Sequence, residues 1–208
     1  TEVNARIRGG SSSQTLVLID GAIVNSGTLG RYNFANLTTD NIERVEVLRG
    51  AQSMLWGSDA MGGVINIVTK RGQGPLSATG FMEYGSFASL REGGMVSGKQ
   101  GAVDYSFSLS RWDTSSFSAV NYRRGAGERD SYRNWQGSGR IGVDLPKDGR
   151  LDFTMRWMNS DVQLDSVSAT SPSDVYGSKN RSQEYVFSGS YEQPLTGWWS
   201  QKLTLARA

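Results

Sequence analysis

The feature that most constrains the fold is a period-two alternation of apolar and polar residues, which runs from Leu76 to the last residue. The segment 103–110, VDYSFSLS, is a clear example. Successive side chains of a β-strand point to opposite faces of a sheet, so each such segment predicts a strand with one apolar and one polar face. We expect seven strands, at residues 77–86, 89–98, 103–113, 135–145, 150–160, 183–193 and 199–207.

The connections between these segments alternate in length. Residues 99–102, 146–149 and 194–197 are short turns, whereas residues 114–134 and 160–182 are long and polar. Strands of about 10 residues joined in this way are typical of a membrane β-barrel, with short turns in the periplasm and long loops outside the cell. Tryptophans near the strand ends suit the aromatic girdles of such a barrel: Trp112, Trp135, Trp157, Trp198 and Trp199.

A soluble β-sandwich, such as a carbohydrate-binding domain, is the alternative fold, because its strands also alternate. Sandwich strands are usually shorter, at about 5–6 residues, and this difference favours the barrel. Seven strands are too few to close into a barrel around a central domain, so the sheet would keep two open edges. Each unpaired backbone N–H or C=O group at such an edge costs several kcal/mol in lipid. We therefore expect the chain to be a piece of a longer protein, with an export signal upstream of Thr1.

Residues 1–72 have a different pattern and predict a small mixed α/β unit. Asp20-Gly21 is a strong turn signal, and a weak helical turn is expected over residues 51–56. The Gly62-Gly63 pair leads into a strand rather than a helix N-terminus, so we expect no nucleotide site there. Strands are expected at Asn4–Arg8, Thr15–Ile19, Glu43–Arg49 and Val64–Val68.

The composition argues against several functional classes. The chain has no histidine and no cysteine, so it lacks the commonest general base, the commonest transition-metal ligand and every thiolate site. This argues against a barrel enzyme such as an outer-membrane lipase or protease. The net charge of +2 is too small to indicate nucleic acid as a partner. We expect no catalytic residues and no enzyme activity.

Three sequence blocks resemble the plug domain of TonB-dependent outer-membrane receptors: TLVLIDG at 15–21, IERVEVLRG at 42–50 and WGSDAMGGVINIVTK at 56–70. Ala51 stands where the family usually has proline, and Trp56 where it usually has tyrosine. The resemblance implies a mainly β chain: the C-terminal part of a plug domain over residues 1–72, and over 73–208 the first seven antiparallel strands of a 22-stranded transmembrane β-barrel. It implies a bacterial outer-membrane location, lipid around the barrel, and TonB as the partner that pulls on an N-terminal segment.

Within this family, vitamin B12 (cobalamin) receptors are the most similar branch. The likeness rests on Gly57-Ser58-Asp59-Ala60 and on the loop segment 117–134. Ferric-siderophore receptors share the plug blocks and remain the alternative. Exposed backbone and small polar groups in two plug loops suit a large, amide-rich ligand. The resemblance implies these substrate-binding residues: Glu2, Asn4, Ser11, Leu29 and Gly30.

Two further sets of charged residues are candidates for ionic contacts. A guanidinium pairs bidentately with carboxylates, so we expect a plug-to-barrel tie from Glu43, Arg44, Glu46 and Arg49. Candidate partners on the barrel are Arg140, Asp152 and Arg156. Carboxylates in outer loops can gather calcium, and some vitamin B12 receptors are known for it. The candidate calcium ligands are Glu128, Asp130, Asp165 and Asp174, and no other cofactor is expected.

Overall fold

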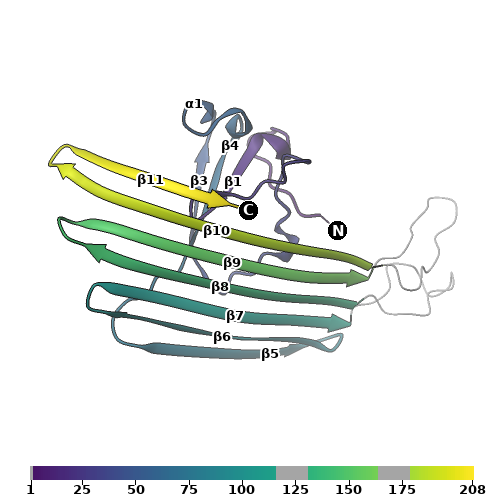
Figure 1. Cartoon of the computed structure of the whole chain (residues 1–208). Helices are drawn as coiled ribbons and strands as arrows, with labels where there is room; N and C mark the ends of the chain where they lie inside the picture. The colour runs from purple at the N-terminus through teal and green to yellow at the C-terminus, as the bar shows by residue number, and fades with distance from the viewer. Residues whose placement is uncertain (1, 116–130, 164–178) are drawn as a thin grey trace, which may run out of the picture.

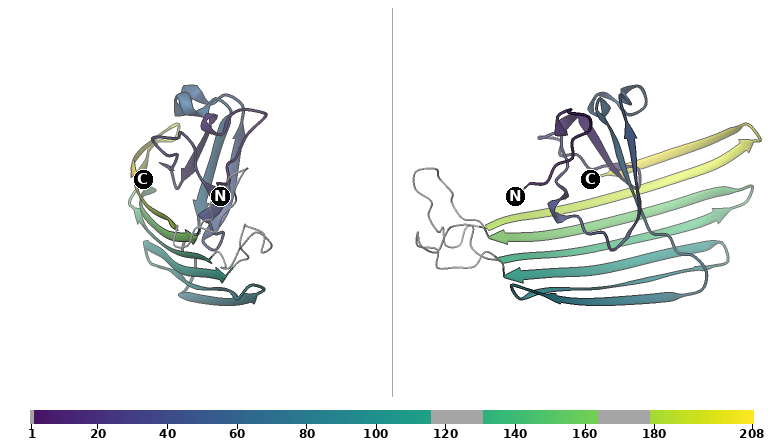
Figure 2. Two further views of the ribbon diagram at one scale, coloured as in Figure 1. Left: turned by 90° about the vertical axis from the view of Figure 1, so that its right-hand side faces the viewer. Right: turned by 180° about the vertical axis from the view of Figure 1, so that it is seen from behind.

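A computed structural model describes residues 2–115, 131–163 and 179–208, which form two separate sheets (Figure 1). A four-stranded sheet lies within residues 15–69, and a seven-stranded sheet lies within residues 77–207. The larger sheet is a long, curved wall, and the smaller unit stands against its concave side (Figure 2). This arrangement confirms the predicted mainly β fold class.

The small unit has the strand order β2-β1-β4-β3. β1 (Thr15–Ile19) pairs antiparallel with β2 (Ala22–Ile23) and parallel with β4 (Gly63–Thr69), and β4 pairs antiparallel with β3 (Ile42–Arg49). None of the helices among the described residues is long and apolar enough to cross a membrane. Short helices lie in the connections: η1 (Ser12–Gln14), η2 (Phe34–Asn36), α1 (Ser53–Trp56) and η3 (Ser58–Ala60).

The core of the small unit is built on the two central strands. Every residue of β1 is buried, which explains why residues 16–19 are all apolar instead of alternating with polar residues. On one face, Val17 and Ile19 pack with Ile67. On the other face, Leu16 and Leu18 pack with Val64 and Ala60. The predicted strands at 15–19, 43–49 and 64–68 are therefore confirmed.

The predicted strand at Asn4–Arg8 is wrong. This segment has no strand pairing in the part of the chain that the structure describes. Arg8 and Gly9 adopt positive φ angles of 49° and 78°, so the chain turns before an extended segment can pair. The preceding residue Val3 is instead held by Asn33 Oδ1, which accepts from its N–H at 3.0 Å. The short strand β2 was not predicted, because two residues give no measurable period.

The wall contains all seven predicted strands, each antiparallel to the next along the chain. β8 and β10 begin at residues 131 and 179, earlier than the 135 and 183 predicted, because polar residues continue the ladder beyond the apolar alternation. The bounds are β5 (Ser77–Gly85), β6 (Ser89–Gln100), β7 (Val103–Ser115), β8 (Ser131–Leu145), β9 (Gly149–Gln163), β10 (Lys179–Thr196) and β11 (Trp199–Arg207).

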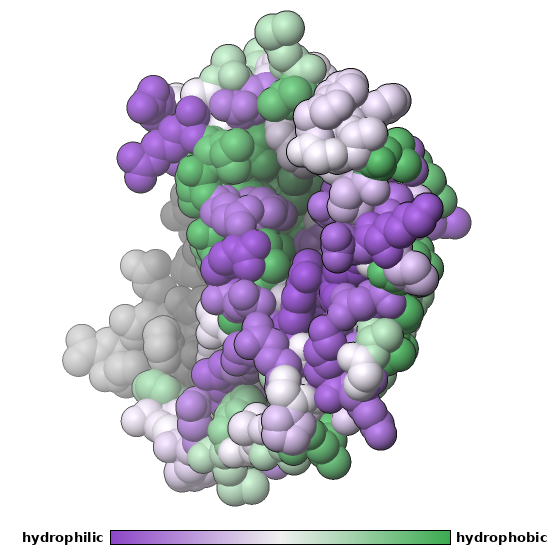
Figure 3. Space-filling view, turned by 90° about the vertical axis from the view of Figure 1, so that its left-hand side faces the viewer, coloured by the Kyte–Doolittle hydropathy of each residue, from purple (hydrophilic) through white to green (hydrophobic). Residues whose placement is uncertain are grey.

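The two faces of the wall have opposite chemistry. Phe107, Met155 and Phe187 share the convex face and are 42–48% exposed. Neighbouring positions such as Ser106 and Ser188 face the small unit and are buried. The space-filling view shows hydrophilic residues between the small unit and the wall, and apolar residues along the outer rim (Figure 3). The wall therefore separates a wet interior from an apolar exterior.

The link between the two sheets passes over the wall at very close range at Gly72. A Cβ added at Gly72 would press against the backbone oxygens of Gly98 and Tyr105, closer than real Cβ atoms come. Neither backbone oxygen can move without breaking the ladder between β6 and β7. Glycine at this position therefore lets the link lie flat on the wall.

We expect Gly72→Ala in the full-length protein to destabilise the packing of the small unit by about 1–3 kcal/mol, as over-packing does elsewhere. The urea midpoint for unfolding of the small unit in detergent is the measurement. Gly189→Ala is the matched control, because a Cβ there would meet nothing within 4 Å. An equal midpoint for the two variants would contradict this account of Gly72.

Candidate functional site

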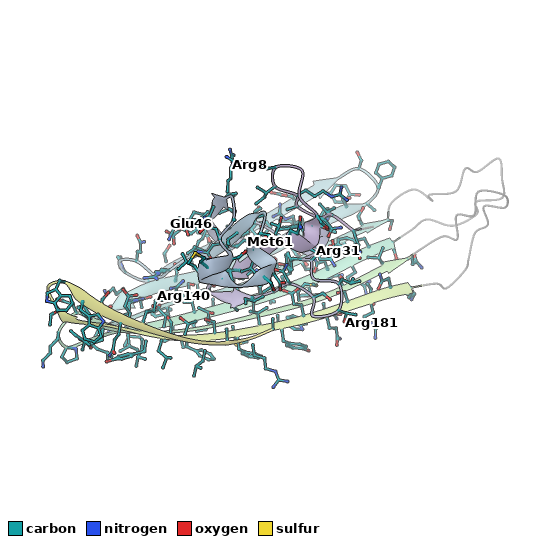
Figure 4. All side chains as sticks on the ribbon, turned by 90° about the horizontal axis from the view of Figure 1, so that it is seen from above. Arg8, Arg31, Glu46, Met61, Arg140 and Arg181 are labelled. Carbon is teal, nitrogen blue, oxygen red and sulfur yellow. The ribbon has the colours of Figure 1, made fainter. Side chains whose placement is uncertain are left out.

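A cavity of about 810 Å³ lies between the loops of the small unit and the inner face of the wall. The small unit lines the cavity with Glu2, Asn4 and several residues of the segment 23–36. The wall lines it with Met158, Glu184 and their neighbours. Figure 4 places Arg31, a lining residue, on the same side of the molecule as Arg181, far from the short turns. The cavity therefore lies toward the end of the wall that carries the long connections.

Three of the five predicted substrate-binding residues line this cavity: Glu2, Asn4 and Leu29. Gly30 and Ser11 are absent from its lining. Gly30 has a φ of 64° and its carbonyl accepts from Asn25 Nδ2 at 2.9 Å, so it shapes the loop. Ser11 caps η1, and its N–H donates to Gln14 Oε1 at 2.9 Å. Contact of all five with substrate stays a prediction.

The loop that carries Leu29 is held in place by one asparagine. Asn25 Oδ1 accepts from the Val17 N–H at 2.7 Å, and Asn25 Nδ2 donates to the Thr15 carbonyl at 3.0 Å. Both partners belong to the buried strand β1. Arg31, on the same loop, pairs with Glu2 at 2.7 Å and so fixes the N-terminal segment across the cavity. The cavity rim is thus ordered before any ligand arrives.

Tyr32 connects this loop to the wall. Its side chain is buried, and its ring packs edge-on against Phe34 with ring centroids 5.0 Å apart. The Tyr32 hydroxyl donates to the carboxylate of Glu184 on β10. Burial raises the pKa of Tyr32 well above its usual range, and the Glu184 charge raises it further. Tyr32 therefore stays neutral and keeps its hydroxyl proton as a donor.

Segment 36–41 of the small unit lies along the inner face of the wall. In the described ranges its contacts use backbone carbonyls, amides and hydroxyls, together with one charged pair between Asp40 and Arg91. Such groups give no charge pattern in a sequence, which is why they were not predicted. The neutral contacts are Asn36 O with Asn134 and Gln136, Tyr132 with Asn36, Thr38 with Gln136, and Asn41 with Ser138.

A buried ionic cluster forms the second attachment. The Asp20 carboxylate accepts from the Thr69 hydroxyl at 2.7 Å and lies 3.4 Å from Arg140 Nη1 on β8. Arg140 also pairs with Asp152 on β9 at 3.1 Å, and Asp152 lies 3.9 Å from Arg71. The Asp20 and Arg140 side chains are only 7% and 6% exposed, so removal of either partner leaves a buried charge poorly compensated.

The four residues predicted to tie the plug to the barrel make other contacts. Arg44 pairs with Glu46 at 2.7 Å and with Glu43 at 3.2 Å, and Asn66 donates to Glu46 at 2.9 Å. Hydrogen bonds from Asn66 and Arg44 hold the pKa of Glu46 below its usual range. Arg49 ends the same edge strand, β3. Among the described residues, β5–β11 are attached instead through Asp20, Tyr32 and segment 36–41, so the barrel role of these four stays a prediction.

Two of the three candidate wall partners do reach the small unit: Arg140 contacts Asp20, and Asp152 contacts Arg71. Arg156 donates to Gln136, which in turn contacts Thr38. The candidate calcium ligands lie outside the described residues: Glu128, Asp130, Asp165 and Asp174. In the part of the chain that the structure describes, no group of three acidic, histidine or cysteine residues could hold a metal ion.

The chain matches known proteins in both of its parts. The family model for the TonB-dependent Receptor Plug Domain matches residues 1–64. The vitamin B12 transporter BtuB of Photobacterium profundum is 40% identical over 95 residues, which cover 46% of this chain and 16% of that protein. The BtuB protein of Vibrio vulnificus is 48% identical over 63 residues, or 30% of this chain and 10% of that protein. The matched region is thus about a sixth or less of these relatives.

Solved structures share the fold across nearly the whole chain. The siderophore receptor PiuA of Acinetobacter baumannii superposes with a TM-score of 0.74 at 17% identity, covering 98% of this chain and 30% of that one. The ferripyoverdine receptor of Pseudomonas aeruginosa superposes with a TM-score of 0.69 at 20% identity, covering 98% of this chain and 28% of that one. At these identities the likeness establishes the fold of the plug and the wall.

We expect Asp20→Asn in the full-length protein to loosen the small unit from the wall by about 1–3 kcal/mol, because Arg140 loses one of its two buried anions. Amide hydrogen exchange of β1 and β4 measures this loosening. Asp59→Asn is the matched control, since Asp59 is exposed and contacts its neighbour Ser58. Equal exchange in the two variants would show that the Asp20 charge does not hold the unit.

The raised pKa of Tyr32 predicts a loss of stability in alkali. An unfolded tyrosine ionises near pH 10, while folded Tyr32 stays neutral to higher pH. Its contribution is therefore complete below pH 10 and declines as the pH rises above that value. Urea midpoints for the full-length protein between pH 8 and pH 11 should fall less steeply for Tyr32→Phe than for the parent. Identical slopes of midpoint against pH for the two proteins would contradict the raised pKa of Tyr32.

Proposed function

We propose that this chain, a TonB-dependent receptor with a plug domain and part of an outer-membrane barrel, serves energy-coupled import of cobalamin. The observation that carries this proposal is the 40% identity to a vitamin B12 transporter over 95 residues. That stretch is long enough to include more than the plug blocks shared across the family. A ferric siderophore is the alternative cargo, since solved structures of the same fold are described as siderophore receptors.

The cavity chemistry supports a large, amide-rich ligand. Amide side chains from three separate segments line it: Asn4, Asn33 with Asn36, and Gln183 of the wall. Amides both donate and accept, so they can match a ligand that carries many carboxamide groups. Leu29 is half exposed at the rim and supplies apolar contact area. In this proposal cobalamin enters from the long-connection end and rests on the plug loops.

The plug attachment supports a plug that moves under an applied pull. Most contacts of segment 36–41 with the wall are neutral hydrogen bonds. The net value of each such bond is about 1 kcal/mol, because water can replace either partner. Many weak contacts hold the plug firmly at rest, yet they can be exchanged for water one after another. TonB, acting on an N-terminal segment, is the proposed source of the pull.

Retention of cyanocobalamin by the full-length receptor in detergent, against a panel of ferric siderophores, tests the proposed cargo. We expect cobalamin to be retained, and Leu29→Glu to weaken its binding at least ten-fold by placing a charge at the cavity rim. Leu55→Glu is the matched control, because Leu55 is 78% exposed and lies outside the cavity. Retention of a siderophore without cobalamin would overturn the cargo assignment.

Two further measurements test the two remaining proposals. A calcium site at Glu128, Asp130, Asp165 and Asp174 would make cobalamin affinity fall on chelation and recover with Ca²⁺. TonB coupling would make deletion of the N-terminal segment abolish uptake by cells while binding persists. A cobalamin affinity that does not change on chelation would contradict the calcium proposal. Uptake that does not change on deletion of the N-terminal segment would contradict the coupling proposal.

A further inference from the structure

The link between the two sheets carries a charge into the buried ionic cluster. Arg71 lies two residues after Thr69, the last residue of β4, and the link then descends to the start of β5 (Figure 1). Thr69 holds the Asp20 carboxylate through its N–H at 3.0 Å and through its hydroxyl at 2.7 Å. Arg71 and Asp20 therefore bring a positive and a negative charge to the wall from one corner of the small unit.

The carboxylate that Arg71 approaches is already bonded by two other guanidinium groups. Asp152 Oδ1 accepts from Arg140 Nη2 at 3.1 Å and from Arg150 Nη2 at 3.0 Å. Asp152 Oδ2 accepts from Arg150 Nε at 2.9 Å. Arg71 Nη2 comes only to 3.9 Å from that oxygen, which is beyond hydrogen-bond range. Arg71 is thus a third cation beside one anion.

The two wall cations have further partners, and Arg71 does not share them. Arg150 also pairs with Asp104 at 2.7 Å, and Arg140 also lies 3.4 Å from Asp20. Within the described ranges, Arg71 forms no ion pair other than the one at 3.9 Å and donates no hydrogen bond. The positive charge of Arg71 is therefore poorly compensated in the docked state.

Burial and like charge both disfavour the cation of Arg71. Burial lowers the pKa of Arg71, and the charges of Arg140 and Arg150 lower it further, while Asp152 acts in the opposite direction. Arginine still stays ionised at neutral pH. A base whose pKa is lowered in the folded protein is less stable there as a cation than it is in water. The Arg71 charge therefore opposes the attraction between the small unit and the wall.

We propose that Arg71 is a positioning residue that opposes docking of the small unit on the wall and so lowers the force needed to release it during transport. A neutral donor at this position would keep a polar contact with Asp152 without the repulsion, so stability alone does not account for the charge. A residue that costs stability is expected where function requires it. The inference rests on the proposed TonB-driven movement of the plug, and it is independent of how the cavity recognises its ligand.

Amide hydrogen exchange of β1 and β4 in the full-length receptor tests the docking role. We expect exchange to be about three-fold slower in Arg71→Gln than in the parent, because the lost repulsion is of the size measured for partly exposed charge pairs. Arg71→Lys keeps the charge and should exchange like the parent. Arg6→Gln is the matched control, because Arg6 is exposed and forms no ion pair with the described residues.

Salt dependence distinguishes repulsion from a change in packing. Salt screens charges that solvent reaches, and the Arg71 side chain is 42% exposed. The difference in exchange between the parent and Arg71→Gln should therefore shrink as the salt concentration rises from about 0.05 M to about 0.5 M. Uptake of cyanocobalamin by cells measures the release role. We expect uptake to be about three-fold slower in Arg71→Gln, with retention of cyanocobalamin in detergent unchanged.

Exchange in Arg71→Gln that is as fast as in the parent, or faster, would overturn the proposal, because Arg71 would then be an ordinary ion-pair partner of Asp152. Slower exchange with unchanged uptake would also overturn it, because the charge would then have no part in release. A parent that neither retains nor imports cyanocobalamin would instead contradict the proposed function. In that case the exchange and salt measurements would still decide whether Arg71 opposes docking.

Discussion

The structure depends on one constraint: the wall must satisfy all its backbone hydrogen bonds between strands while it separates two different solvents. In hydrocarbon an unpaired backbone group costs several kcal/mol, so the strands must be long and continuously paired. β7, β8 and β9 meet this demand with strands of 13, 15 and 15 residues that pair in unbroken register. Opposite chemistry on the two faces follows from the alternation of side chains along each strand.

The interior face then decides how the plug is held. A polar lining permits many hydrogen bonds, and the plug offers backbone carbonyls and small amides to match it. The buried ion pair between Asp20 and Arg140 fixes the position of the plug along the wall. The pair is directional, and it joins the β1–β2 turn of the plug to β8 of the wall. The plug has its own apolar core around β1 and β4, and Val186 of the wall strand β10 packs into part of it. The plug is therefore held to the wall by polar contacts and by this one apolar contact among the described residues.

The wall strands could be predicted from sequence because a strand with one apolar and one polar face has a strict period of two. The period fails where that constraint ends, so the starts of β8 and β10 were placed four residues too late. β1 was recognised because its residues 16–19, which are buried on both faces, are all apolar. The segment Asn4–Arg8 misled the prediction because alternation over a few residues does not reveal the turn at Arg8 and Gly9.

The candidate site was less predictable, for a physical reason. We predicted contacts with the wall from the charges of the sequence. In the structure, however, Glu43, Arg44 and Glu46 pair with residues of their own sheet. The wall contacts of Asn36, Thr38 and Asn41 come from small neutral groups whose role depends on the surface opposite them. Tyr32 likewise joins the plug to the wall through a hydrogen bond with Glu184, a residue distant in sequence. Such pairings are properties of the assembled fold.

The central claim is that lipid lies on one face of the wall and the plug on the other, and labels placed at successive positions of one strand measure it directly. Single cysteines placed along residues 151–157 of β9 in the full-length receptor, spin-labelled in bilayers, would report each face. We predict high collision rates with oxygen dissolved in the bilayer at positions 151, 153, 155 and 157, and low rates at 152, 154 and 156. Uniform exposure to a water-soluble relaxation agent on both faces would contradict the account.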